Sequence, residues 1–159
     1  MKPEARQVLE NIIKKLDEDS KLPDEGAWTA HVQNKPDEES LKQTYIYLGI
    51  IMSAQEGTEN AIGKILVGEN ILTPALTHKG WKFWKSLPVT QEEKKAIDDA
   101  IIRWSNQKVA RMESLQNSIE SSSNNDLLNQ VISMASMLDI ASSCRKQLSD
   151  DLKKILGLA

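Results

Sequence analysis

Apolar residues recur every three or four positions over long stretches of this chain, which is the spacing that lines one face of an α-helix. The pattern is most extended over residues 89–159, where the polar run 121–125 separates two periodic stretches. Thr90 and Glu93 form a capping box before the first stretch, and Gly157 suits the C-cap of the second. We therefore predict a long antiparallel helical hairpin over residues 89–159.

Residues 1–88 carry the same pattern in shorter pieces. A helix is expected over residues 3–19, because its apolar residues form one stripe at helical spacing. A loop is expected over residues 20–37, which two prolines and a glycine punctuate. A second helix is expected over residues 37–55, with an acidic first turn that favours its positive N-terminal end.

This second helix is apolar on most of its sides, so we expect it to lie centrally in the core. Its inner stripe consists of Leu41, Tyr45, Leu48 and Met52, and Ile46, Ile50 and Ile51 widen it. Gly57 is expected to end the helix, because glycine is a poor helix former. Thr58 can then cap a third, short helix that stops near Gly68.

These segments predict an all-α fold, a five- to six-helix bundle in a single domain over residues 1–159. The long C-terminal hairpin would pack on, or project from, a smaller N-terminal helical part over residues 1–88. The sequence is compatible with a short edge strand only at residues 71–76, which Pro74 interrupts. A length of 159 residues, with 40% hydrophobic and 27% charged residues, is typical of one globular domain.

The sequence also indicates the cellular compartment in which we expect the protein. No apolar run is long enough for a membrane-spanning helix, and no signal-peptide pattern is visible near the N-terminus. Cys144 is the single cysteine, so no intrachain disulfide can form. We expect a soluble, cytoplasmic protein in a reducing compartment, with Cys144 as an inert thiol.

No motif for catalysis or cofactor binding is found. His31 and His78 are far apart and have no metal-ligand spacing, and neither a Gly-rich phosphate loop nor a G-x-S-x-G motif occurs. Adjacent acids such as Asp150 and Asp151 point in different directions on a helix, so we expect them to be solvated. We therefore expect no enzymatic activity, no cofactor and no metal site.

The most unusual stretch runs from residue 76 to residue 87 and combines lysines and aromatic residues with no acid. Its candidate partner contacts are Lys79, Trp81, Lys82, Trp84 and Lys85. The three lysines step by three positions, so they share one helix face. Two interpretations stay open. Either the lysines contact an acidic partner, or the aromatic residues are core and the lysines form a solvated face.

Trp28 is a further candidate contact. It is the one large apolar residue in the loop expected over residues 20–37. Either it anchors this loop onto the core, or it is an exposed contact residue, because tryptophan is enriched in binding hot spots.

The motif L-T-H-K-G at residues 76–80 follows a short β-like segment and precedes an apolar helix. It resembles the L-T-x-K-G element that closes the wing in winged-helix DNA-binding domains. The resemblance covers residues 71–87. The chain departs from that family, because residues 71–76 are too short for a wing of two strands and Lys64 is the one basic residue on the corresponding recognition helix. The resemblance implies DNA contacts at Asn60, Lys64, Lys79 and Lys82.

The leading functional hypothesis is a non-enzymatic protein-interaction module, such as an adaptor, inhibitor, immunity-type or regulatory protein, acting through a helical surface. It rests on the lack of catalytic motifs, a net charge of −3 and the long amphipathic helices. The alternative is a winged-helix-like DNA-binding transcriptional regulator that dimerises through the C-terminal hairpin. We expect a protein partner and no membrane partner. We also expect a homodimer, because the hairpin would expose two apolar seams.

Overall fold

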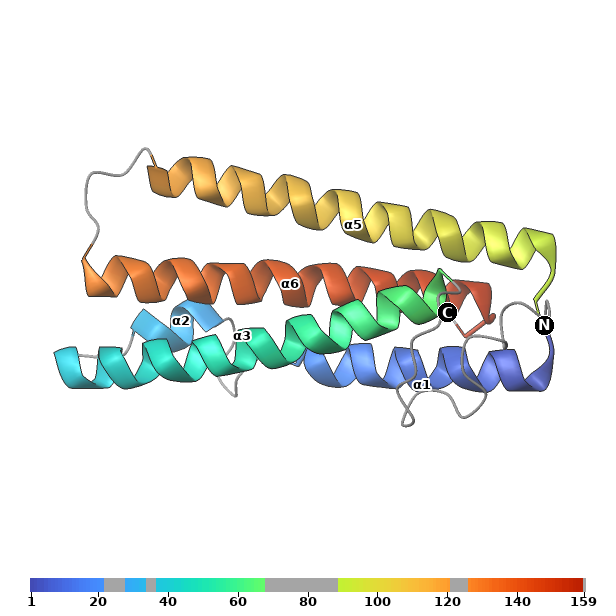
Figure 1. Cartoon of the computed structure of the whole chain (residues 1–159), viewed down its shortest axis with the longest axis horizontal. Helices are drawn as coiled ribbons and strands as arrows, with labels where there is room; N and C mark the ends of the chain where they lie inside the picture. The colour runs from blue at the N-terminus through green and yellow to red at the C-terminus, as the bar shows by residue number, and fades with distance from the viewer. Residues whose placement is uncertain (22–27, 34–36, 68–88, 121–125, 159) are drawn as a thin grey trace.

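The computed structural model describes residues 1–21, 28–33, 37–67, 89–120 and 126–158. Within these ranges the chain forms five α-helices and no strand. The helices are α1 (Pro3–Asp19), α2 (Trp28–Gln33), α3 (Glu38–Leu66), α5 (Gln91–Glu120) and α6 (Leu127–Ile155) (Figure 1). The predicted all-α fold and the C-terminal helical hairpin are confirmed. No helix among the described residues is long and apolar enough to cross a membrane.

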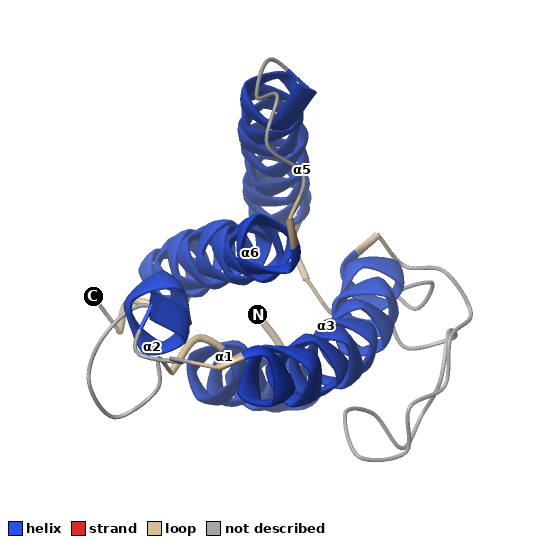
Figure 2. Ribbon diagram, turned by 90° about the vertical axis from the view of Figure 1, so that its left-hand side faces the viewer, coloured by secondary structure: helices blue, strands red, loops and turns tan. Residues whose placement is uncertain are grey.

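The central helix of the bundle is α6. The helices α1, α2, α3 and α5 all pack against it, and α5 touches α3 only slightly. Figure 2 shows α5 on one side of α6, with α1 and α2 on the other side and α3 beside them. The hairpin is therefore packed onto the N-terminal helices through α6 rather than projecting from them.

The helix α3 is continuous where two helices were predicted. Gly57, which was expected to end the first helix, lies inside α3. Thr58, which was expected to cap the next one, donates a hydroxyl hydrogen bond to the carbonyl oxygen of Ala54 at 3.2 Å. A glycine inside a helix costs about 1 kcal/mol relative to alanine. Tertiary packing on either side of it outweighs that cost, because Leu48 and Ile62 are both fully buried.

The position of α3 also differs from the prediction. It is not the core helix that its apolar composition suggested. Leu48 is fully buried, but Tyr45, Ile46 and Ile50 are 40%, 63% and 64% exposed. The reason is that α3 lies at the edge of the bundle and packs mainly on α6 (Figure 2).

The expectations at the other helix ends are largely confirmed. The Thr90 hydroxyl accepts a hydrogen bond from the Glu93 amide at 3.1 Å, and the Glu93 carboxylate accepts one from the Thr90 amide at 3.4 Å. Gly157 follows α6 with a φ of +71°, a conformation that favours glycine. By contrast, the loop expected over residues 20–37 contains the short helix α2. The strand considered at residues 71–76 lies outside the described residues.

The core consists of two apolar clusters along α6. One lies toward its C-terminal end, where Leu148 and Leu152 meet α1, the end of α3 and the start of α5. The other lies in its N-terminal half, where Val131 and Leu138 meet α2 and the first half of α3. A layer of charged and polar side chains lies between the two clusters along the sequence of α6.

Asp17 links α1 to α6 through a hydrogen bond and an ion pair. Its carboxylate accepts a hydrogen bond from the Ser149 hydroxyl at 2.5 Å and pairs with the Lys153 ammonium at 3.0 Å. Burial raises the pKa of Asp17, but the hydrogen bonds from Ser149 and Lys153 outweigh burial and hold the pKa below its usual value of 3.8. Because the pKa is lowered in the folded state, the ionised carboxylate stabilises the fold at neutral pH. That contribution is lost as pH falls through the folded-state pKa.

We therefore expect Asp17→Asn to destabilise the protein at neutral pH and to lose this deficit below about pH 4. Denaturant unfolding of wild type and variant over a pH series measures the difference. Asp99→Asn is the matched control, because Asp99 pairs with Lys95 on the exposed surface of α5. A stability difference that stays constant down to the acidic end of the series would contradict the assignment.

Candidate functional site

Most of the predicted contact residues lie in the segment 68–88, outside the described residues. Lys79, Trp81, Lys82, Trp84 and Lys85 lie outside the described residues, so both interpretations of them stay predictions. Trp28 is described, and it is buried with 8% of its surface exposed. The interpretation of Trp28 as an exposed partner contact is therefore wrong, and the interpretation as a core anchor is correct.

Trp28 is buried because α6 holds α2 in place. The carboxylate of Asp139 accepts hydrogen bonds from the amides of Trp28 and Thr29 at 2.8 and 3.3 Å, and from the Thr29 hydroxyl at 2.7 Å. First-turn amides have no partner within their own helix, so Asp139 caps α2 from a neighbouring helix. Trp28 and Val32 then pack into the apolar cluster that contains Leu138.

A groove of about 470 Å³ lies between α3, α5 and α6. Its apolar lining consists of Tyr45 and Met52 from α3, Leu115 and Ile119 from α5, and Ile132, Met134 and Met137 from α6. At this end of the molecule, α5 lies further from α6 than at the other end in both views (Figures 1 and 2).

The hydroxyl groups in the lining leave the groove largely apolar. The Ser133 hydroxyl donates to the carbonyl oxygen of Asn129 at 2.8 Å, and the Ser136 hydroxyl donates to that of Ile132 at 2.9 Å. Both groups are therefore satisfied by the backbone of α6 itself. A ligand in the groove meets mainly side-chain carbon and sulfur there.

The inner seam of α5 explains why the groove is open. Ile97 and Ala100, near the start of α5, are buried. Further along, the inward residues Ile101, Trp104, Met112, Leu115 and Ile119 are only partly buried. These residues contact α6 but hardly contact α3, because α3 and α5 have few contacts with each other. The side of α5 that faces α3 therefore has room for another apolar element.

The groove continues into a second cavity of about 150 Å³, with which it shares Met52 and Met137. Glu59, Lys108 and Arg145 line this cavity. The apolar groove thus ends at a charged layer inside the bundle.

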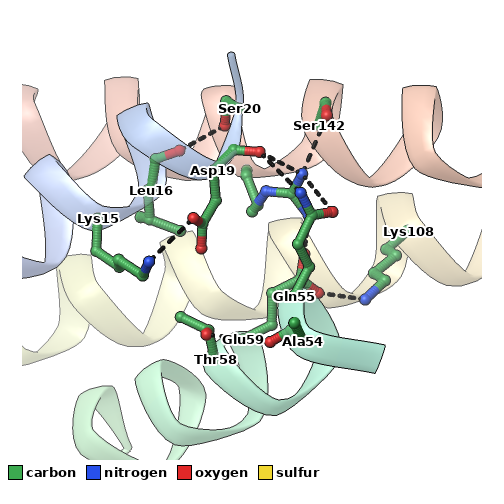
Figure 3. Close-up of polar contacts among 11 residues, drawn as sticks. Lys15, Leu16, Asp19, Ser20, Ala54, Gln55, Thr58, Glu59, Lys108 and Ser142 are labelled. Carbon is green, nitrogen blue, oxygen red and sulfur yellow. Dashed lines mark hydrogen bonds and ion pairs between the residues drawn. The ribbon is translucent and has the colours of Figure 1, made fainter. Parts of the chain in front are cut away.

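Glu59, Lys108 and Arg145 form a buried ion cluster (Figure 3). Glu59 and Arg145 are 3% and 1% exposed. The Arg145 guanidinium donates to one carboxylate oxygen of Glu59 at 2.5 Å, and the Lys108 ammonium pairs with the other oxygen. Arg145 also donates to the carbonyl oxygen of Asp19 at 2.7 Å, to Gln55 Oε1 at 3.1 Å and to Ser142 Oγ at 3.0 Å.

The cluster ties four helices together. Asp19 ends α1, so its carbonyl is one of the helix-end acceptors that lack an intrahelical partner. Arg145 of α6 satisfies that carbonyl and at the same time neutralises Glu59 of α3. Lys108 adds α5 to the same layer. The ion cluster thus fixes the relative positions of the helices that form the groove.

Sequence reasoning missed this cluster although the sequence carries a signal for it. Glu59, Lys108 and Arg145 each occupy an inward helix position where the periodicity favours an apolar residue. Opposite charges at such positions are expected to pair, because an unpaired buried charge is very costly. The expectation that Asp151 is solvated is also wrong. It is 6% exposed and pairs with Arg103 at 2.6 Å.

Comparison of the chain with protein-family models, curated proteins and solved structures finds no match. Among the side chains that the structure describes, no group of three or more His, Cys, Asp or Glu residues is placed to hold a metal ion. The groove between α3, α5 and α6 is the feature of the described residues from which we infer a function.

Proposed function

We propose that the protein is a non-enzymatic interaction module that binds an amphipathic helix of a partner protein in the groove between α3, α5 and α6. Adaptor, inhibitor, immunity-type and regulatory proteins can all act in this way. The supporting observation is an apolar groove of about 470 Å³ bordered by three helices, one of which has a half-covered inner seam. Grooves of this kind take the apolar face of a partner helix.

The dimensions of the groove suit a short helical segment. Its lining runs along α6 from Asn129 to Met137. This stretch spans about 12 Å at 1.5 Å per residue, or roughly two helical turns. A partner helix with apolar residues at positions i, i+3 or i+4, and i+7 would reach along it. The methionines Met52, Met134 and Met137 add flexible, polarizable contact surface.

The charges at the open end favour a basic partner. The first turns of α3 and α6 and the last turn of α5 lie at the same end of the molecule (Figure 1). These turns and their caps carry Asp37, Glu38, Glu39, Glu120 and Asp126. Lys42 lies one turn further along α3 and pairs with Glu38 at 3.5 Å. A partner helix with a basic flank is therefore favoured over an acidic one, which like charges would repel.

A designed peptide tests this proposal. The probe is a fluorescein-labelled helical peptide of leucine and lysine with the leucines at helical spacing, and its anisotropy is measured as the protein is added. We expect saturable binding and an affinity at least about tenfold lower for Ile119→Glu, which corresponds to about 1.4 kcal/mol. The physical reason is that the peptide would have to bury an unpaired carboxylate in the groove.

Val109→Glu is the matched control. Val109 also lies on α5, but it is 53% exposed and does not line the groove. A peptide with the same leucine spacing and glutamates in place of lysines should bind more weakly than the basic one. Equal affinities of wild type, Ile119→Glu and Val109→Glu for the basic peptide would contradict the proposal. Circular dichroism of each variant checks that the helices are intact.

The winged-helix alternative has less support. Its recognition helix was predicted to begin at Thr58, which lies inside the continuous helix α3. Residues 71–87, which carry the resemblance, lie outside the described residues. For dimerisation through the hairpin, α1, α2 and α3 cover α6, and the half-covered seam of α5 is the surface that we assign to the partner helix. We therefore do not propose DNA binding.

A further inference from the structure

One side of α3 carries an exposed stripe at heptad spacing. The α3 stripe consists of Glu39, Gln43, Ile46, Ile50, Ser53, Gly57, Asn60 and Lys64, which follow one another in alternating steps of four and three. This is the spacing at which residues of two coiled helices face each other, and Ile46 and Ile50 are the apolar members of the α3 stripe. Every residue of the α3 stripe is exposed. Ile46 and Ile50 are more than 60% exposed, and a Cβ added at Gly57 would have no atom within 4 Å.

The α3 stripe is complementary to the same stripe of a second copy that runs in the opposite direction. Its midpoint lies between Ile51 and Met52. Positions at equal distances from this midpoint pair Glu39 with Lys64, Gln43 with Asn60, Ile46 with Gly57, and Ile50 with Ser53. When two copies run in opposite directions, a carboxylate faces an ammonium, an amide faces an amide, and each isoleucine faces a small residue that leaves room for it.

We infer that a second copy of this chain occupies the α3 stripe, so that the protein forms a two-fold symmetric dimer through antiparallel α3 helices. In a two-fold contact each residue pair occurs twice, once in each direction. A parallel pairing would place Glu39 beside Glu39 and Lys64 beside Lys64, and it would leave unfilled space where Gly57 meets Gly57. Like charges and unfilled space both disfavour it. The charge pattern therefore selects the antiparallel arrangement.

This dimer does not depend on the proposed function of the groove. The groove uses Tyr45 and Met52 of α3. The centre of the α3 stripe lies about 180° around the helix from Leu48, which is fully buried against the rest of the bundle. The dimer surface and the groove are therefore separate, and both can be occupied in one molecule. The dimer surface also differs from the hairpin seams that the sequence suggested.

Cysteine cross-linking tests the register of the dimer. In the antiparallel arrangement residue 46 of one copy faces residue 57 of the other. The double variant Ile46→Cys/Gly57→Cys is expected to form a disulfide-linked dimer on mild oxidation. Each single variant is expected to give about tenfold less, because identical positions lie too far apart for a disulfide. Within one chain the two positions are about 16 Å apart along the helix, so an intrachain bond cannot form. Cys144 is buried, and wild type gives the background.

Sedimentation analysis measures the strength of association. We expect a reversible monomer–dimer equilibrium for wild type, and a dissociation constant on the order of 100-fold higher for Ile50→Glu, which introduces two unpaired charges per dimer at about tenfold each. Glu39→Lys and Lys64→Glu should each weaken the dimer, and their combination should restore it. Val109→Glu on α5 should dimerise like wild type.

Several outcomes would overturn the inference. These are a wild type that stays monomeric up to millimolar concentration, an Ile50→Glu variant that dimerises as tightly as wild type, and efficient cross-linking of either single-cysteine variant. Circular dichroism monitors folding of each variant. If Ile50→Glu unfolds, the variants Glu39→Lys and Lys64→Glu and their combination still test the dimer. Glu39 and Lys64 lie outside the apolar centre of the α3 stripe. Failure of the combined reversal to restore association would then contradict the proposed register.

Discussion

Replacing Arg145 with alanine is expected to lower the free energy of unfolding by about 3–5 kcal/mol, the usual range for removing one partner of a buried ion pair. Glu59, which is 3% exposed, would keep Lys108 as its remaining cationic partner. The carbonyl of Asp19 would also lose the donor that caps α1 at 2.7 Å. Domains are typically stable by about 5–15 kcal/mol, so this loss is a large share of the total. Denaturant unfolding followed by circular dichroism measures it.

Two further variants distinguish a lost charge partner from lost packing. Glu59→Leu/Arg145→Met replaces the pair with apolar residues, and such exchanges are often neutral or stabilising. We expect this double variant to be more stable than Arg145→Ala alone. Lys95→Ala is the surface control, because its pair with Asp99 is exposed and is expected to contribute about 0.5 kcal/mol or less. An Arg145→Ala variant as stable as Lys95→Ala would show that the ion cluster does not hold the helices together.

The helices that could be predicted are those whose signals are local. The apolar stripe of α1 is continuous in the sequence, and all of its members are buried. The start of α5 depends on the reciprocal bonds of Thr90 and Glu93, which are three residues apart. The end of α6 depends on the left-handed backbone that Gly157 readily adopts. Interactions between residues only a few positions apart can be recognised in the sequence without knowledge of the tertiary structure.

The predictions that were wrong depend on which other helices lie next to a given helix. Periodicity places the apolar residues Ile46 and Ile50 in a helix, but it does not show whether another helix covers them. In the structure α3 lies at the edge of the bundle, so both side chains are exposed. Gly57 was misjudged for a related reason. A local preference of about 1 kcal/mol decides a helix boundary only where tertiary packing is weaker than that preference.

The groove and the ion cluster could not be predicted because both depend on long-range contacts. Arg145 and Glu59 are 86 positions apart, and Lys108 and Glu59 are 49 apart. Their inward positions on three helices could have suggested buried pairing, but not which charges meet. The groove depends on α5 being covered mainly by α6. That arrangement follows from how the bundle closes and not from the sequence of α5.

The position of α6 at the centre of the bundle leads to a second large effect. Replacing Leu148 with alanine is expected to cost about 2–5 kcal/mol, the range for truncating a fully buried leucine. Leu148 has no exposed surface and belongs to the cluster that α1, the end of α3, the start of α5 and α6 build together. Because four helices border the space that the side chain leaves, a shift of any one of them cannot fill it without loosening its contacts with the others.

Leu128→Ala makes the same chemical change near the other end of α6, where the side chain is 39% exposed. We expect it to cost about 1 kcal/mol or less, because the site is open enough for solvent to fill. Thermal or denaturant unfolding of both variants measures the contrast. Similar losses at the two positions would contradict the burial of Leu148 among four helices. A loss confined to Leu148 would agree with an α6 whose C-terminal half is buried by α1, α3 and α5, while its N-terminal half borders the groove.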